Sequence, residues 1–286
     1  MTFSIVACDI RAEAWGVAVA AHSLAIGAVV PWVEVGVGAV ATQALTNVAF
    51  GPHGLALIGA GSSARETLDQ LVSADQGRDQ RQAGVVDARG RSASHTGSSC
   101  LPWAGGRSGR GYAAQGDLLA GPAVIDAMGT SFEGSDGQPL AHRLMDALRA
   151  GEAAGGDRRG RQSAALRIAT PDAGFGGSNN VPLDLRVDDH PEPIDELARL
   201  LALYEQQTGP TPRDRWIPLD AVLLEELRDL LVRAGHVLPE GLSGVTASLR
   251  TWVAGENLGA RWWDDDSLDP VVLERLRVAA TAASTP

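Results

Sequence analysis

The first 60 residues carry short apolar runs separated by glycine or charged residues, a pattern that predicts β-strands. Four runs, rich in valine and alanine, occupy residues 3–7, 15–20, 27–32 and 38–44. Short β-branched runs broken by glycine are typical of sheets. Glycine and alanine on nearly every strand let another backbone approach closely, and we attribute this to a second packed sheet rather than to a ligand.

Helical periodicity begins after residue 62. Ser63 and Glu66 have the spacing of a capping box, and Leu68, Leu71 and Val72 follow on one face, so a helix is expected to start here. The pattern then predicts a hairpin over residues 82–96, helices over about 122–132 and 139–150, strands at 163–168 and 183–187, and an amphipathic helix over 193–207. Strands grouped in runs favour the α+β class over a Rossmann sheet. Two sheets with helices outside both are most economically stacked in four layers, α-β-β-α.

A second domain is expected near the C-terminus. Two prolines within residues 209–213 cannot continue the preceding helix, which predicts a domain over residues 1–208, a linker over 209–215 and a small all-α domain over 216–286. Its helices are predicted over about 219–234, 245–253 and 269–283. The last begins with Asp269 followed by Pro270, a favourable order for a helix cap and first turn.

Composition narrows the classes of function. The chain is 44% hydrophobic and 21% charged, which supports at least one large core. Its formal net charge of −11 is repelled by phosphate and by anionic lipid, so nucleic acid is not expected as a partner. All 24 basic residues are arginine, which excludes Schiff-base lysine chemistry and a P-loop. No cofactor is implied.

Cys8 and Cys100 stand alone in the sequence, so neither a disulfide framework nor a zinc site is indicated, and both are expected to be buried thiols. Every apolar run is interrupted before the roughly 20 residues that a membrane span needs. The N-terminus lacks a basic region followed by an apolar one. A cytoplasmic location is therefore expected.

The presence of threonine at position 2 needs an explanation. The first strand begins at Phe3, directly behind Met1 and Thr2. Chain ends are usually poorly ordered unless something ties them down. Either Thr2 is merely the first residue of an edge strand, favoured there by its β propensity, or the chemistry of the protein requires threonine at this position.

Several stretches resemble one known family. They are Thr2–Ala7, Gly38–Asn47, Tyr112–Gly116, Gly155–Ala165 and Leu185–Pro191. Together they closely resemble domain-of-unknown-function family 1028, an uncharacterised bacterial family placed among the N-terminal nucleophile (Ntn) hydrolase-like proteins. The resemblance covers about residues 2–207 in colinear order. The tail, especially residues 252–258 and the following Arg261–Trp262, resembles a small helical domain described as peptidoglycan-binding in some members.

The resemblance implies an Ntn-type α-β-β-α sandwich and a role for Thr2. Removal of Met1 would leave Thr2 with a free α-amine beside its own hydroxyl. An α-amine with an ordinary pKa of about 7.7–8.0 can act as base for that hydroxyl. The expected activity is hydrolysis of a C–N bond in a small or cyclic amide, with Thr2 as nucleophile through an acyl-enzyme ester.

Amide hydrolysis also needs hydrogen-bond donors aimed at the developing oxyanion. Thr42, Gln43, Asn47 and Gln115 are the candidates. Gln43 and Gln115 could equally satisfy backbone groups at nearby strand ends. The resemblance implies asparagine where this chain has Asp117, and an ionised carboxylate there would repel an oxyanion.

A glycine-flanked loop over residues 155–162 provides further candidates. Arg158 and Arg161 could grip a substrate carboxylate, and Asp157 could orient the Thr2 amine. The same loop could instead be a solvated turn with weak ion pairs. The sequence Asp188-Asp189-His190 is read as a helix cap rather than a metal site, because neighbouring strand residues point to opposite faces, and no metal is expected.

A binding protein is the alternative to an enzyme. In that case the sandwich would be catalytically idle, and the tail would dock a cell-wall fragment or another partner through Trp252, Trp262 and Trp263. These tryptophans could also simply form the core of a small domain. Homodimerisation through an outer helix layer or a sheet edge is a general expectation for the class. An exported envelope hydrolase would need a non-standard export route.

Overall fold

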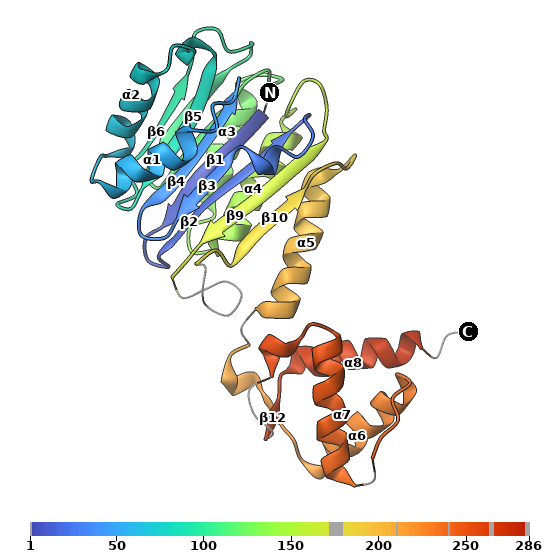
Figure 1. The fold of residues 1–286 in the computed structure, drawn as a ribbon. Coiled ribbons are helices and arrows are strands. Elements are labelled where there is room, and N and C mark those ends of the chain that lie inside the picture. Colours follow the sequence, from blue (N-terminus) through green and yellow to red (C-terminus); the bar gives the residue numbers. More distant parts are fainter. Residues whose placement is uncertain (1, 172–179, 210, 240, 263–265, 284–286) are drawn as a thin grey trace. The chain divides into compact units, whose positions relative to one another are not determined.

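The structure is a computed structural model, which describes residues 2–171, 180–209, 211–239, 241–262 and 266–283. It is of the mixed α+β class and divides into two compact units, Met1–Arg199 and Leu200–Pro286 (Figure 1). The α+β class predicted from the grouping of strands is confirmed. Four short 3-10 helices also occur among the described residues, at Ile26–Ala28, Arg78–Gln80, Arg213–Arg215 and Gly259–Arg261.

A six-stranded antiparallel sheet holds the first strand near its centre, in the order β10-β9-β2-β1-β8-β7. Its strands in chain order are β1 (Thr2–Asp9), β2 (Ala14–Ala21), β7 (Gly105–Gly109), β8 (Tyr112–Gly116), β9 (Ser163–Ala169) and β10 (Leu183–Val187). Thr2 pairs with Ala21, and Phe3 pairs with both Ala20 and Gly116. Thr2 therefore begins a central strand rather than an edge strand.

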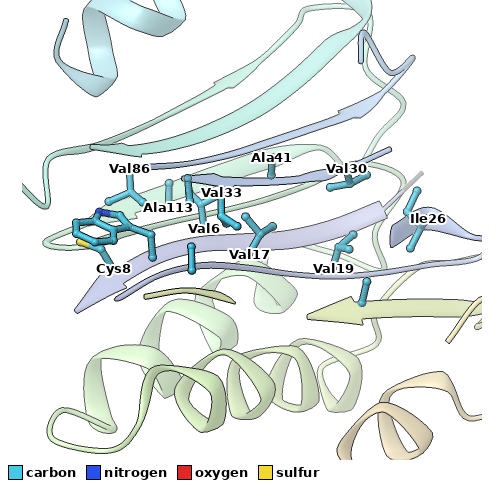
Figure 2. Close-up of a cluster of buried hydrophobic side chains, with 14 of the residues drawn as sticks. Val6, Cys8, Val17, Val19, Ile26, Val30, Val33, Ala41, Val86 and Ala113 are labelled. Carbon is cyan, nitrogen blue, oxygen red and sulfur yellow. The ribbon is translucent and has the colours of Figure 1, made fainter. Parts of the chain in front are cut away.

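A second, four-stranded sheet faces the first. Its strands, in the order β3-β4-β5-β6, are β3 (Pro31–Glu34), β4 (Gly38–Ala44), β5 (Arg81–Asp87) and β6 (Ser92–Thr96). Valine and alanine side chains fill the space between the sheets (Figure 2). Small side chains allow the close approach that the sequence indicated.

Helices cover the outer faces of both sheets. The helices α1 (Phe50–Gly59) and α2 (Ala64–Ala74) pack on the four-stranded sheet, and α3 (Ala123–Gly134) and α4 (Leu140–Ala153) pack on the six-stranded one (Figure 1). The predicted capping box of Ser63 and Glu66 starts α2. Since both faces of β1 are covered, nearly all of this strand is buried.

Side chains of β1 alternate between two environments, as in any strand. Val6 and Cys8 belong to the core between the sheets, and Ser4 bonds across that core to Gln43 on β4. Thr2 has the same parity, so its side chain lies on the face toward the four-stranded sheet. The alternation therefore places the candidate nucleophile between the sheets.

Three predictions along the first unit are wrong in detail. Residues 27–32 were expected to form one strand, but a 3-10 turn occupies Ile26–Ala28 and β3 starts only at Pro31. Residues 50–59 form α1, although only strands were expected before residue 60. Glycine and alanine fill much of α1, and it has no side-chain N-cap, so it lacks the signals of a helix start. Strands β7 and β8 were not predicted.

The C-terminal unit is helical, with one short two-stranded ladder. Its helices are the end of α5 (Pro193–Thr208), then α6 (Ala221–Arg233), α7 (Leu242–Gly255) and α8 (Pro270–Ala282), and the ladder joins β11 (Ile217–Pro218) to β12 (Ser267–Leu268). Leucine side chains of α6, α7 and α8 form its core. Within the described residues, no helix of either unit is both long and apolar enough to cross a membrane.

The division between the units falls after Arg199, inside α5, and the linker over 209–215 stays a prediction. The Arg261 guanidinium donates to the carbonyl of Glu205 (2.7 Å) and also to that of Gln206. These bonds tie the last turns of α5 to the C-terminal unit.

Gly84 offers a test of the packing between the sheets. A Cβ added at Gly84 would lie 2.1 Å from the Gln115 Oε1 atom, which is itself fully buried. We expect Gly84→Ala to cost about 1–3 kcal/mol in the free energy of unfolding, because the buried amide cannot move without losing its bonds. Urea denaturation of the two proteins measures this cost. Gly59→Ala, where only Val37 lies near the new Cβ at 3.9 Å, serves as the control.

Candidate functional site

Thr2 lies in a buried polar cluster at one end of the six-stranded sheet. It is 1% exposed. Its backbone N–H donates to Asp117 Oδ1 at 3.2 Å, and its carbonyl oxygen accepts from the Asp117 N–H at 3.1 Å. The carbonyl also accepts from Gln43 Nε2 at 3.1 Å. The position of Thr2 is thus fixed by bonds from both sheets.

Asp157 reaches the same cluster from the loop that precedes β9. It is 5% exposed, and its backbone forms an isolated bridge with Leu119. Its carboxylate accepts from the His22 N–H at 3.1 Å, from the Arg159 N–H at 2.9 Å and from Arg159 Nη2 at 2.8 Å. Burial alone would raise the pKa of Asp157, but these hydrogen bonds outweigh it and hold the pKa below its usual range.

Asp117 differs from Asp157 in its environment. Burial raises the pKa of the Asp117 carboxyl, and the nearby negative charge of Asp157 acts in the same direction, although the hydrogen bond from Thr2 opposes them. Asp117 is 2% exposed. Two adjacent buried carboxyls whose pKa values are driven apart are a pattern that occurs at catalytic sites. Here the pKa of Asp157 is lowered and that of Asp117 is raised.

Beside Thr2, a network of buried amides spans the two sheets. Gln43, Gln82 and Gln115 are each 0% exposed. Gln43 Nε2 also bonds Gln82 Oε1 at 2.8 Å, and the Ser4 hydroxyl donates to Gln43 Oε1 at 2.5 Å while accepting from Gln115 Nε2 at 2.7 Å. Gln115 Oε1 has no partner within the described structure. The amide donors of Gln43 and Gln115 are therefore engaged with the protein itself, which favours their backbone-satisfying role.

Two members of this network, Ser4 and Gln82, were not among the sequence candidates. The signal was present, because each is a polar residue directly followed by a run of four apolar residues in a largely buried strand. A buried polar side chain must find a partner. Such positions in two facing strands indicate a shared network.

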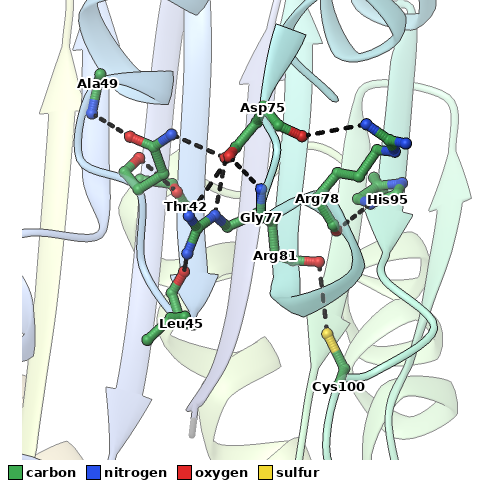
Figure 3. Close-up of polar contacts among 10 residues, drawn as sticks. Thr42, Leu45, Ala49, Asp75, Gly77, Arg78, Arg81, His95 and Cys100 are labelled. Carbon is green, nitrogen blue, oxygen red and sulfur yellow. Dashed lines mark hydrogen bonds and ion pairs between the residues drawn. The ribbon is translucent and has the colours of Figure 1, made fainter. Parts of the chain in front are cut away.

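Thr42 and Asn47 do not join Thr2. Thr42 Oγ1 donates to the Asn47 carbonyl at 3.0 Å, and Asn47 Nδ2 donates to Asp75 Oδ2 at 2.9 Å. Asp75 in turn pairs with Arg81 at 2.8 Å, and Figure 3 shows this cluster beyond the end of β4. The Arg81 guanidinium holds the pKa of Asp75 far below its usual range. These residues form a structural ion-pair cluster, and the structure does not bring them to Thr2.

The arginines of the 155–162 loop are divided between different environments. Arg158 is exposed, and its backbone N–H donates to the Leu118 carbonyl. Arg161 is also exposed and forms ion pairs with Glu152 and Glu192. The arginine that meets Asp157 is Arg159, which was not singled out from the sequence. The loop is thus neither fully solvated nor a cluster of free guanidiniums.

The tryptophans and cysteines singled out from the sequence, where the structure describes them, lie in or near the cores of the two units. Trp252 is 5% exposed in the core of the C-terminal unit, and Trp262 is partly buried against the same core. Trp263 lies outside the described residues. Cys8 is buried and Cys100 partly so. In the described part of the chain, no group of three or more His, Cys, Asp and Glu side chains is placed to hold a metal ion.

Comparisons with known proteins place these features in context. The sequence model of a family described as "Family of unknown function (DUF1028)" matches residues 2–197. The crystal structure of a protein from Silicibacter pomeroyi, assigned to DUF1028, is similar to this chain with a TM-score of 0.65 and 32% sequence identity, over 71% of this chain and 89% of that one. No curated protein matches the chain.

Proposed function

The chain belongs to the DUF1028 family, and on that premise we propose that its first unit is an Ntn-type four-layer sandwich that hydrolyses small amides, with Thr2 as the N-terminal nucleophile. One observation carries the proposal. The backbone nitrogen of Thr2, which becomes an α-amine once Met1 is removed, lies 3.2 Å from a buried carboxyl group at the start of a central strand. A threonine that was present only for its β propensity, at the start of an edge strand, would need no such arrangement.

The chemistry uses atoms of a single residue. Thr2 Oγ1 attacks the amide carbonyl carbon, and its proton passes to the α-amine and from there to the departing amine as the C–N bond breaks. Water then hydrolyses the resulting ester, which releases the carboxylic acid and regenerates the hydroxyl. The bonds from Gln43 and Asp117 to the Thr2 carbonyl keep the nucleophile in place during both steps.

Asp117 and Asp157 have separate parts in this proposal. Asp117 Oδ1 accepts the hydrogen bond from the Thr2 nitrogen and so fixes the orientation of the α-amine. Asp157 remains ionised and holds Arg159 and the His22 backbone in place around the site.

Capture by an electrophile tests the proposal. Purified protein is incubated with a small β-lactone, which acylates an activated hydroxyl, and the adduct is mapped by peptide mass spectrometry. Since Thr2 is 1% exposed in the full chain, the reaction also tests whether loss of Met1 opens a path to it. Acylation at Thr2, with turnover of at least one compound in an amide library, supports the proposal. Protein that lacks Met1 and still forms no adduct and cleaves no amide is a catalytically idle scaffold.

Asp117→Asn is expected to move the pH dependence of the activity. An ionised Asp117 stabilises the protonated form of the α-amine, so removing this charge should lower the pKa of the amine by about one unit. The acidic limb of the kcat/KM profile then moves to lower pH by the same amount. Asp69→Asn, a change at an exposed residue of α2, should leave the profile unchanged.

Asp117→Asn should also change the Tm in a direction that can be predicted. Because the folded-state pKa of Asp117 is raised, its ionised form costs stability at pH values above that pKa, and the cost vanishes below the unfolded pKa of about 3.9. Asp117→Asn should therefore raise the Tm at pH 7 but leave it nearly unchanged near pH 3. A Tm that falls at pH 7 contradicts this account of the site.

The C-terminal unit is not assigned a ligand. Docking of a cell-wall fragment was expected to use tryptophan side chains, and the two that are described lie in or against the core. Catalysis by the first unit is the function that the geometry supports best.

A further inference from the structure

A pocket lies at the other end of β1 from Thr2. Cys8 is six residues from Thr2 on this strand, a distance of about 20 Å at 3.4 Å per residue. Here the end of β1 lies beside the β7–β8 turn, because the Cys8 N–H donates to the Gly111 carbonyl at 2.9 Å. The β5–β6 turn is next to it, because the Gly111 N–H donates to the Gly90 carbonyl, also at 2.9 Å. The connection between α3 and α4 closes the side. The pocket has a volume of about 530 Å³.

Arg143 of α4 is the unusual residue in this pocket. It is only 7% exposed. Its Nη2 donates to the Phe132 carbonyl at 3.0 Å, and its guanidinium carbon lies 3.9 Å from the centre of the Phe132 ring. Its Nε atom is buried without a hydrogen-bond partner, and none of the ion pairs among the described residues includes it.

A buried guanidinium without a counter-charge is expensive, and such groups are normally paired. The carboxylates that share the pocket are engaged elsewhere or exposed. Asp9 accepts from the N–H groups of Arg11 and Ala12, and Glu133 bonds Tyr112 and Arg107. Among the described residues, no carboxylate therefore pairs with Arg143.

The rest of the lining restricts the kind of anion. The pocket is lined by as many carboxylates as guanidiniums, so it has no net positive charge to hold a multiply charged group such as phosphate; the residues are Asp9, Glu133, Asp136, Arg11, Arg110 and Arg143. Ile10, which is 50% exposed, offers apolar surface in the same pocket as the guanidinium. A carboxylate matches the planar fork of arginine with two hydrogen bonds.

We propose that this pocket binds a small monocarboxylate, whose carboxylate pairs with Arg143 and whose hydrocarbon chain packs on Ile10. The site does not involve Thr2. Binding is therefore expected in the Thr2→Val variant as well, whether or not that residue is a nucleophile.

Calorimetric titration of the full chain with acetate, butyrate, hexanoate and inorganic phosphate tests the proposal. Affinity should rise about fourfold for each methylene that becomes buried, and phosphate should bind more weakly than hexanoate. Arg143→Met keeps the packing of the side-chain stem and should weaken hexanoate binding at least tenfold, with the fold checked by circular dichroism. Arg110→Gln, on the exposed rim, should change it by less than threefold.

Ile10→Ser keeps the proposal testable if the Arg143 variant does not fold. This exposed residue can be changed with little effect on the core, and the gain from acetate to hexanoate should then largely disappear. The proposal is overturned if no carboxylate binds saturably, if phosphate is preferred, or if folded Arg143→Met binds hexanoate as the unaltered chain does. An unchanged chain-length dependence in Ile10→Ser overturns it equally.

Discussion

Thr2→Val is expected to abolish amide hydrolysis, with a fall in kcat/KM of roughly 10³-fold or more. Valine has nearly the shape of threonine and the same preference for strands, so β1 should keep its pairing with β2 and β8. What it removes is the hydroxyl proposed as the nucleophile, and loss of a nucleophile has effects of this size or larger. Initial rates with the best amide from a library screen measure the change.

Thr2→Ser is the matched variant, since serine supplies the same hydroxyl beside the same amine. It should retain activity within about tenfold of the parent chain. Both variants should unfold within about 1 kcal/mol of the parent, because every bond that fixes Thr2 in this structure uses its backbone. Equal activity of Thr2→Val and the parent, from folded protein, would show that another residue is the nucleophile.

Arg261→Met is expected to destabilise the C-terminal unit by about 3–5 kcal/mol. Arg261 is 5% exposed and pairs at 2.8 Å with Asp269, which is 1% exposed. Removing one partner of a buried pair leaves the other charge uncompensated, a change that typically costs this much. Arg261 also holds two carbonyls at the end of α5 and the Thr211 hydroxyl, which lose their donor. Differential scanning calorimetry should resolve an earlier transition for this unit.

An exposed ion pair in the same unit provides the control. Arg277 pairs with Glu226 at 2.7 Å, but the side chains are 47% and 40% exposed. Arg277→Met should therefore change the free energy of unfolding by less than about 1 kcal/mol. The double variant Arg261→Met, Asp269→Asn should recover part of the loss, because no buried charge is left unpaired. Equal effects at Arg261 and Arg277 contradict the structural role given to Arg261.

Much of the fold was predictable because its signals are local. The capping box at Ser63, the Asp269–Pro270 helix start and the leucine stripe of α6 each lie within a few residues of one another. The start of α1 has no such signal, and the turn at Ile26 depends on Ala25 in a left-handed conformation, with φ of 53°. A backbone conformation that alanine rarely adopts is imposed by tertiary contacts, so the sequence pattern could not reveal it.

The candidate site was harder to predict than the fold. Thr2 and Asp117 come together across 115 residues of chain, and Asp157 is brought in by its bridge with Leu119. Thr42 and Gln43 are adjacent in sequence, yet they face opposite sides of β4, and only Gln43 reaches Thr2. Without the partner strand, the sequence alone did not decide which of the two would face the site. Arg159 was missed for a similar reason, because nothing local distinguishes it from Arg158 and Arg161.

The most direct measurement of the central claim is the intact mass of the protein purified from a bacterial cytoplasm, followed by sequencing of its N-terminus. The account predicts that the mass corresponds to loss of Met1 and that the first residue is Thr2, so that its amine and hydroxyl are available together. A chain that retains Met1 has no free amine at Thr2, and this result would contradict the proposed nucleophile.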